Sequence, residues 1–310
     1  MKPTLRQLEY IVAIAETGTF SLAARRMNVS QPSLSAQVAD CEETLGKTIF
    51  ERRRGGVQPT EFGLEILRRA RVVLREMEDL IATGRDTGIF GGRLRLGVLP
   101  SIGPYLLPNV VRVLHHNHPQ LRLVLRDDST SGLAHGLANG ELDLIISTPE
   151  DYPGTYQMPL FKERLWAGFA SDDPLANSDT PIKAQQLRNR TLLTLGQKFR
   201  ITGIIQDIAR QSGSRVSEDY SGSSLDAIRL MAATGAGVAI FPEIYAKTEA
   251  RRGQDVVLRQ IAMGSAARQL ALIQRHEKAP REGSDILHEV LKAEAGRILA
   301  ENASSNGPLT

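Results

Sequence analysis

The sequence contains a single cysteine and lacks any long apolar run. Cys41 alone can form neither an intrachain disulfide nor a structural zinc site of the Cys₄ or Cys₂His₂ kind. No run approaches the ~18 apolar residues that cross a bilayer. Arg6, Glu9 and Glu16 interrupt the segment in which a secretory signal would need its apolar core. We therefore expect a cytoplasmic protein that needs no oxidising compartment.

The chain also carries little net charge. Its 38 basic residues against 35 acidic ones leave a formal charge of +3. Any nucleic-acid contact must therefore come from locally placed charges rather than from a polybasic surface. A length of 310 residues favours about two domains, at ~150 residues each. An apolar share of 41% suits a globular protein and argues against wholesale disorder.

The first 60 residues predict a winged helix-turn-helix. Apolar residues recur at three- and four-residue spacing over 4–17, and a short second helix follows over 19–27. Ser30 is placed to cap a third helix, and Pro32 suits its first turn. Two helices joined by a turn of a few residues are typical of the helix-turn-helix. The segment 49–60 begins apolar and continues through a basic stretch and a Gly-Gly turn, which predicts a β-hairpin wing.

A long helix over 61–84 should connect this region to the rest of the chain. Its apolar residues alternate four and three apart, at Ile66, Ala70, Val73, Met77 and Leu80. This heptad seam covers under three heptads, so we expect it to pack against a second copy and other surfaces. Four glycines among the nine residues 84–92 then mark a domain boundary.

Beyond the boundary the pattern changes to alternating strands and helices, so we expect an α/β region with largely parallel sheets. Strands are predicted at 94–99, 121–125, 142–147, 165–170, 191–195, 238–241 and 270–274. Helices are predicted at 105–116, 131–139, 202–211, 225–234 and 284–301. The tail 302–310 should be disordered.

Several motifs in register resemble the LysR-type transcriptional regulators. They are Ala23-Ala24, Val29-Ser30-Gln31-Pro32-Ser33-Leu34-Ser35, Leu45-Gly46, Phe50-Glu51-Arg52 and Thr60-Glu61-Phe62-Gly63. Weaker likeness continues through 94–100, 140–144 and 235–242, so the resemblance covers nearly the whole chain. It implies a DNA-binding domain over 1–60, a linker helix and hinge over 61–90 and an effector-binding domain over 91–301.

The resemblance further implies a periplasmic-binding-protein-like effector module of two lobes between which the chain crosses twice. Lobe I would comprise about 91–161 and 269–301, and lobe II about 162–268. It also implies a homotetramer built from dimers, with double-stranded DNA and a small-molecule effector as partners, while the missing apolar run argues against a membrane. The first 60 residues hold eight basic residues against six acidic ones, which indicates modest DNA affinity per subunit. Dimerisation would supply the second half-site.

DNA contacts are expected from the third helix, its flanks and the wing. A recognition helix presents polar groups near its N-terminus to base edges in the major groove. Gln31 and Gln37 are the sharpest candidates, because a Gln amide can bond adenine in a bidentate fashion. The wing arginines can reach phosphates or an adjacent minor groove. The candidate set is Arg25, Arg26, Ser30, Gln31, Pro32, Ser33, Ser35, Gln37, Arg52, Arg53 and Arg54. The alternative interpretation is that these residues form only a solvated surface.

The effector should bind between the lobes, where the carboxyl ends of parallel strands converge. Hydroxyls at helix starts suit a carboxylate or another anion. The candidates are Ser101, Ile102, Thr130 and Ser131 from one lobe and Phe199 and Thr202 from the other. Ordinary helix caps are the alternative interpretation.

The N-terminal helices most resemble the peroxide-sensing branch of the family, which uses two cysteines in the effector module. This chain has none there, and Phe199 falls about where the reactive cysteine would be, so thiol oxidation is not expected as the switch.

Other chemistries fit the sequence less well. Gly235-Ala236-Gly237 follows a predicted helix and precedes an apolar run, the reverse of a phosphate-binding loop, so we expect a tight turn. His115, His116 and His118 lack a nearby second group of ligands, so no metal or cofactor is expected. Hydrolase signatures such as Gly-x-Ser-x-Gly and His-Glu-x-x-His are absent. The alternative to a regulator is a small-molecule binding protein or an enzyme on the two-lobed scaffold, with the N-terminal helices as an oligomerisation unit.

Overall fold

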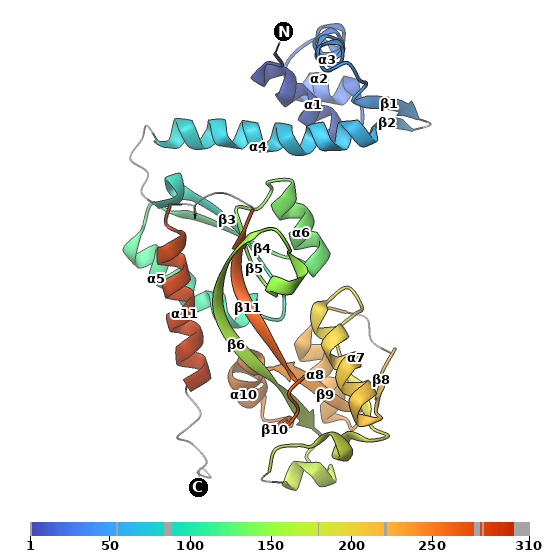
Figure 1. The fold of residues 1–310 in the computed structure, drawn as a ribbon, viewed down its shortest axis with the longest axis vertical. Coiled ribbons are helices and arrows are strands. Elements are labelled where there is room, and N and C mark those ends of the chain that lie inside the picture. The colour runs from blue at the N-terminus through green and yellow to red at the C-terminus, as the bar shows by residue number, and fades with distance from the viewer. Residues whose placement is uncertain are drawn as a thin grey trace. The chain divides into compact units, whose positions relative to one another are not determined.

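We describe a computed structural model of the chain (Figure 1). It describes residues 2–53, 55–83, 89–178, 180–219, 222–275, 280 and 282–300. The chain divides into two compact units, residues 1–87 with 135–142, and residues 88–134 with 143–310. We call them the N-terminal and C-terminal units and describe each separately. The predicted contact residue Arg54 and the predicted disordered tail 302–310 lie outside the described residues.

The N-terminal unit begins with three helices, α1 (Leu5–Thr17), α2 (Phe20–Arg26) and α3 (Gln31–Leu45). Each starts at a hydroxyl cap, because Thr4, Thr19 and Ser30 accept hydrogen bonds from backbone N–H groups of their own first turns. The three helices enclose a core in which Ile11, Ile14, Ala23, Leu34, Val38 and Cys41 are fully or almost fully buried. The predicted helices and the turn between the second and third are therefore present.

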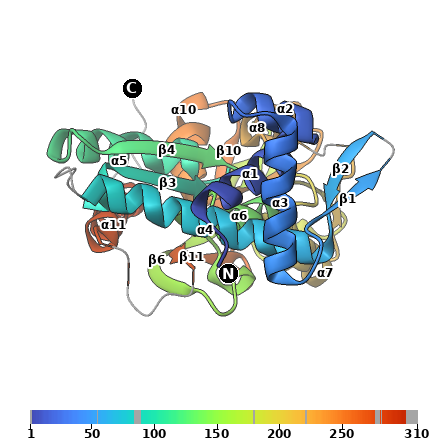
Figure 2. The same ribbon diagram turned by 90° about the horizontal axis from the view of Figure 1, so that it is seen from above.

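A two-stranded hairpin and a long helix complete this unit. Strands β1 (Phe50–Arg53) and β2 (Gly56–Pro59) pair antiparallel, with Phe50 opposite Pro59. Figure 2 shows this hairpin extending away from the helices as the predicted wing. Helix α4 (Glu61–Thr83) follows, capped by the Thr60 hydroxyl, which accepts from the Gly63 N–H at 2.9 Å.

The C-terminal unit is built on a strongly bent sheet in the order β4-β3-β5-β11-β6-β9-β7-β8, with β10 also paired to β6. Its first lobe holds η1 (Ile89–Gly92), β3 (Arg93–Val98), α5 (Gly103–Asn117), β4 (Arg122–Asp127), the first part of α6 (Thr130–Ala138, of which 135–138 belong to the N-terminal unit), β5 (Leu144–Ser147), η2 (Pro149–Asp151) and α11 (Ser284–Ala300). Its second lobe holds η3 (Pro174–Asn177), η4 (Ala184–Leu187), β7 (Thr191–Leu193), α7 (Arg200–Ser212), β8 (Arg215–Val216), α8 (Leu225–Ala233), β9 (Val238–Pro242), α9 (Glu243–Tyr245), η5 (Ala246–Ala250), α10 (Arg251–Gly253) and β10 (Val257–Gln260).

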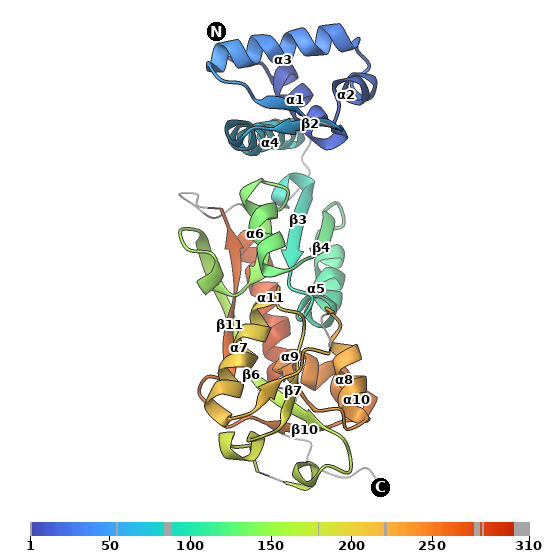
Figure 3. The ribbon, with the colours of Figure 1, turned by 90° about the vertical axis from the view of Figure 1, so that its right-hand side faces the viewer.

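Two long strands join the lobes. Strand β6 (Tyr156–Phe169) pairs with β11 (Ala267–Gln274) over its first part and with β9 and β10 over its last part. Figures 1 and 3 show β6 passing from the lobe of α5 and α6 to the lobe of α7 and α8. The chain thus crosses between two lobes, as the resemblance implied.

The expectation of largely parallel sheets is wrong for this crossing region. Strands β3, β4 and β5 are parallel, as are β7, β8 and β9, but β6 and β11 run antiparallel to every strand they pair with. The predicted strand 165–170 is only the end of β6. The short strands β8 and β10 and the helical segment 243–253 were not predicted. No described helix is long and apolar enough to span a membrane.

Candidate DNA-binding surface and effector site

The recognition helix α3 presents its first turn to the outside. Gln31, Pro32 and Ser33 are exposed, whereas Ser35 and Gln37 are half-buried. The Ser30 hydroxyl accepts from the Ser33 N–H at 3.3 Å, so this serine acts as the helix cap. The buried stripe Leu34, Val38 and Cys41 holds the opposite face of the helix against the core. The polar side chains therefore lie off the apolar stripe, as predicted.

The basic candidates around this helix are exposed. Arg25 is exposed at the end of α2, and Arg26 beside it pairs with Glu16 at 2.6 Å. Arg53 on the wing pairs with Glu51 at 2.7 Å. Exposed pairs of this kind contribute about 0–1 kcal/mol, so a phosphate can compete for either arginine. The side chain of Arg52 lies outside the described residues.

A carboxylate that sequence reasoning missed fixes the wing to the recognition helix. Glu42 Oε1 accepts the backbone N–H groups of Ile49 at 2.6 Å and Phe50 at 3.1 Å. The wing is also tied to the turn after α1, because the Val57 N–H donates to the Gly18 carbonyl at 2.9 Å. The sequence could not predict this role, because Glu42 on a surface helix has the same pattern as a solvated charge.

In the C-terminal unit, Ser101 belongs to a buried polar group between the lobes. It lies after β3, is 3% exposed, and its hydroxyl accepts from Arg268 Nη1 at 3.1 Å. Arg268 Nε in turn donates to Glu163 Oε1 at 2.7 Å, and Glu163 Oε2 accepts the Ile244 N–H at 3.1 Å. Burial raises the pKa of Glu163, and Arg268 opposes that rise. The group links the first lobe, both crossing strands and the second lobe.

Thr130 begins α6, and its hydroxyl is buried without a partner among the described residues. Its carbonyl accepts from the Tyr152 hydroxyl at 2.9 Å. Burial raises the pKa of Tyr152 to about 12, so this hydroxyl stays protonated at neutral pH. The neighbouring Asp151 approaches Arg200 Nη1, at the start of α7 in the other lobe, at 3.5 Å. These contacts connect the starts of α6 and α7 across the two lobes.

The other candidates have different surroundings. Ile102 is fully buried at the start of α5, and Ser131 is exposed, with its hydroxyl 3.3 Å from that of Ser129. Phe199 is 5% exposed at the start of α7 and provides no side-chain cap. The buried Thr202 hydroxyl donates within its own lobe, to the carbonyls of Leu195 at 2.9 Å or Gly196 at 3.0 Å. Thr202 is thus engaged locally, unlike Thr130.

The residues missed in this region are Glu163, Arg268, Asp151 and Arg200. The first two are adjacent in the β6–β11 register but are 105 residues apart in the chain. Glu163 lies within the charged run 162–164, so the sequence gives no signal that it is buried or which residue is its partner. Each pairing depends on how the two lobes are joined.

The remaining motifs have simple structural roles. Gly235 adopts φ +80° in the turn between α8 and β9, which is the predicted tight turn. Within the described residues, no cluster of three or more His, Cys, Asp or Glu side chains is arranged to hold a metal ion. Cys41 is fully buried in the N-terminal core, and burial raises its thiol pKa. A thiol in this state is a poor nucleophile.

Together, a winged helix-turn-helix and a two-lobed α/β unit define the class of DNA-binding proteins that carry a ligand-sensing module. Two family models match the chain: the bacterial regulatory helix-turn-helix protein, lysR family, over residues 5–64, and the LysR substrate binding domain over residues 88–296. The chain therefore belongs to the LysR-type transcriptional regulators. They are DNA-binding transcription regulators rather than enzymes, so the enzyme alternative is not supported.

Its relatives include regulators of the OxyR kind. The chain is 30% identical over 291 residues to the "DNA-binding transcriptional dual regulator OxyR" of Escherichia coli K12, covering 93% of this chain and 95% of that protein. It is 32% identical over 277 residues to a "probable hydrogen peroxide-inducible genes activator" of Streptomyces viridosporus, covering 88% of each. A full-length OxyR variant from Pseudomonas aeruginosa superposes with a TM-score of 0.72 at 29% identity, covering 94% of both chains.

Proposed function

We propose that this LysR-type regulator responds to a small anionic effector bound between the lobes, rather than to oxidation of its own thiol. The Thr130 hydroxyl carries the proposal, because it is buried without a protein partner at the start of a helix. A buried hydroxyl without a partner costs free energy, which a ligand oxygen can recover. Ser101, Ile102, Ser131, Phe199 and Thr202 are proposed to complete the site.

The anionic character of the effector rests on the start of α7. No side chain caps this helix, although the Thr202 N–H donates to the Phe199 carbonyl at 3.0 Å. Such a terminus attracts negative charge through its N–H groups and its dipole. Arg200 adds a cation there, and its side chain is 46% exposed. An anion could therefore share Arg200 with Asp151 and alter the link between the lobes.

Peroxide sensing is the second candidate, because several relatives are named as peroxide-inducible activators. The only cysteine of this chain lies in the N-terminal core, and its buried thiol has a raised pKa. Replacing Cys41 with Ala should therefore leave regulation unchanged. A lost peroxide response in that variant would favour thiol sensing over a dissolved effector.

A panel of carboxylates and phosphorylated metabolites, tested by thermal unfolding of the full chain, should identify the effector. A ligand at one hundred times its Kd stabilises the folded state by about 2.7 kcal/mol. Thr130→Val removes the hydroxyl at similar volume and should weaken that ligand by about tenfold. Thr234→Val, at an exposed hydroxyl, is the matched control. Equal affinity in wild type and Thr130→Val would place the effector elsewhere.

We propose that Gln31 reads the operator by contacting a base edge. The other exposed polar residues of α3 would contact phosphates or grooves, as would Arg25, Arg26 and the wing arginines. Gln31→Ala should weaken operator binding by about 1–3 kcal/mol and leave binding to random DNA nearly unchanged. A matched loss on both DNAs, measured by fluorescence anisotropy, would rule out base reading. Ala36, next to the same face and exposed, provides a neutral control as Ala36→Ser.

We propose that two copies pair through α4 to form a dimer, and that two dimers assemble into a homotetramer. Support comes from the predicted seam, in which Val73, Met77 and Leu80 are 43%, 38% and 66% exposed in the single chain. Apolar side chains spaced along one helix favour burial against a second copy. Two copies would present two recognition helices to two half-sites.

A further inference from the structure

Strand β6 carries two cations on the face opposite its buried glutamate. Lys162 and Arg164 are exposed and flank Glu163, which is fully buried with Arg268. Successive residues of a strand point to opposite faces, so the two cations share one face. In the part of the chain that the structure describes, neither cation has a carboxylate within 4.0 Å.

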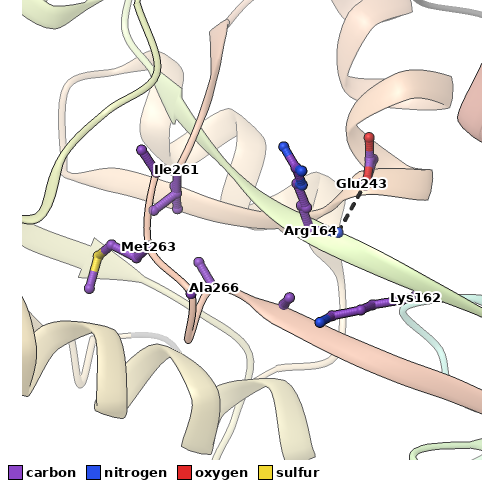
Figure 4. A pocket seen from close by; sticks show the side chains of 9 residues that line it. Lys162, Arg164, Glu243, Ile261, Met263 and Ala266 are labelled. Carbon is purple, nitrogen blue, oxygen red and sulfur yellow. Dashed lines mark hydrogen bonds between the residues drawn. The ribbon is translucent and has the colours of Figure 1, made fainter.

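A cavity of about 510 Å³ lies against this face. The rest of its lining comes from the segment 261–267, in which Ala262 is exposed and Met263 is half-buried, whereas Ile261 and Ala266 are almost fully buried in the core of the second lobe. Figure 4 shows these apolar side chains on one side, with the Arg164 and Lys162 side chains on the other. The cavity thus has two cations on one side and the accessible apolar atoms of Met263 and Ala262 on the other, and its volume lies within the ~300–1,000 Å³ of small-molecule sites.

The one acidic residue lining the cavity does not neutralise the two cations. Glu243 Oε2 accepts the backbone N–H of Arg164 at 3.1 Å, and its Oε1 lies 3.0 Å from Lys247 Nζ. Both side chains are about nine-tenths buried, so solvent screens this ion pair little and Lys247 balances the Glu243 charge. Two positive charges therefore remain at the cavity without compensation.

The apolar wall is held in place before any ligand arrives. The Ala262 N–H donates to the Ile182 carbonyl at 2.8 Å, and the Ala266 carbonyl accepts from the Leu165 N–H at 2.9 Å. The Ser265 hydroxyl donates to Gln211 Oε1 on α7 at 2.8 Å. A preformed wall reduces the ordering cost of binding.

We infer that this cavity is a second ligand site, distinct from the proposed effector site, which takes an organic dianion with an apolar body, such as a phosphate monoester. Arg164 and Lys162 would hold the dianionic head by charge-assisted hydrogen bonds. Met263 and Ala262 would cover the apolar body. The inference does not depend on the effector site, because none of its residues belongs to that site.

Phenyl phosphate is the probe, with inorganic phosphate supplying the charge alone and benzyl alcohol the ring alone. Calorimetry on the full chain should show that phenyl phosphate binds at least about tenfold more tightly than either fragment, since each contacts one wall only. The double variant Lys162→Gln/Arg164→Gln should weaken phenyl phosphate about a hundredfold, at roughly tenfold for each lost charge-assisted bond. Met263→Glu, which places a carboxylate on the apolar wall, should also abolish binding.

Lys183→Gln/Arg188→Gln is the matched control, because it removes the same charge from exposed residues of the same lobe. It should bind phenyl phosphate as the wild type does, and so should Thr130→Val. Absence of binding to the wild type, equal binding to the cavity double variant, or loss of binding in Thr130→Val would each overturn the inference. Melting temperatures of all variants confirm that they are folded.

Discussion

The two units of this protein differ in which side chains they expose and which they bury. Among the described residues, the N-terminal unit exposes seven large apolar side chains, five of them on α4, while the C-terminal unit exposes only Leu125 and Leu230. The C-terminal unit instead buries charged and hydroxyl groups, including Glu163, Arg268 and Thr202.

This contrast separates a unit whose exposed side chains suit contacts with other molecules from one that places polar groups in its interior. Exposed apolar residues on a long helix and exposed polar residues on α3 both suit surfaces that bind another molecule. Buried polar groups cost free energy unless they are paired, so those of the C-terminal unit hold a defined arrangement of its two lobes. Binding at the exposed residues therefore depends on the concentration of a partner. The arrangement that the buried polar groups hold depends instead on substitutions inside the fold.

The largest expected effect comes from Arg268→Met, which leaves Glu163 buried without its countercharge. Removing one partner of a buried pair costs about 3–5 kcal/mol. Arg210→Met, at an exposed pair with Asp207 on α7, should cost within about 1 kcal/mol. Chemical denaturation of both variants measures the difference. Similar losses would mean that the buried pair does not hold the lobes.

The pH dependence of the same variant provides a second measurement. Burial already raises the pKa of Glu163, and losing Arg268 removes the attraction that opposes this rise. The folded variant should then bind a proton at pH values where the unfolded chain, with a Glu pKa of about 4.3, does not. The stability loss should therefore be smaller at pH 5 than at pH 7. A loss that grows on acidification would contradict a buried, unpaired Glu163.

Gly63→Ala should have the next largest effect, within the N-terminal unit. A Cβ at this position would overlap the carbonyl oxygen of Ile49, which belongs to the backbone and cannot move aside cheaply. Overpacking costs about 1–3 kcal/mol, and here it should displace the wing from the start of α4. Gly296→Ala on α11, where a Cβ meets nothing within 4 Å, should instead stabilise the chain by about 0.5–1 kcal/mol. Thermal unfolding monitors both variants, and a neutral Gly63→Ala would show that the junction is tolerant.

The same contrast explains what the sequence could predict. Hydroxyl caps such as Ser30 and the spacing of Leu34 and Val38 are local signals, so the N-terminal helices and wing could be located within a few residues. The length of β6 could not, because the charged run Lys162, Glu163 and Arg164 interrupts its apolar residues. The hydroxyls at strand ends were identifiable by type, but whether Thr130 is free and Thr202 engaged depends on contacts that no local pattern contains.

Met77→Glu tests whether the exposed apolar face of α4 is an interface. A carboxylate within the seam would be buried by a second copy, so the variant should dissociate at least about tenfold more readily than the wild type. Arg71→Glu, outside the seam on the same helix, changes charge without this cost and is the control. Sedimentation velocity over a concentration series measures both. An unchanged oligomer in Met77→Glu would remove α4 from the interface.

The smallest expected effect concerns Arg53 on the wing, where an exposed ion pair competes with DNA. Arg53→Ala should lower affinity for operator and random DNA alike, and flatten the salt dependence by about one unit if the arginine contacts one phosphate. Glu51 holds this guanidinium at 2.7 Å, so Glu51→Gln should free it and strengthen binding to both DNAs. Opposite changes in the two variants, seen in salt titrations, would identify Arg53 as a phosphate contact. If both variants keep the wild-type slope, the wing arginine faces solvent and the N-terminal unit depends on α3 for its DNA contacts.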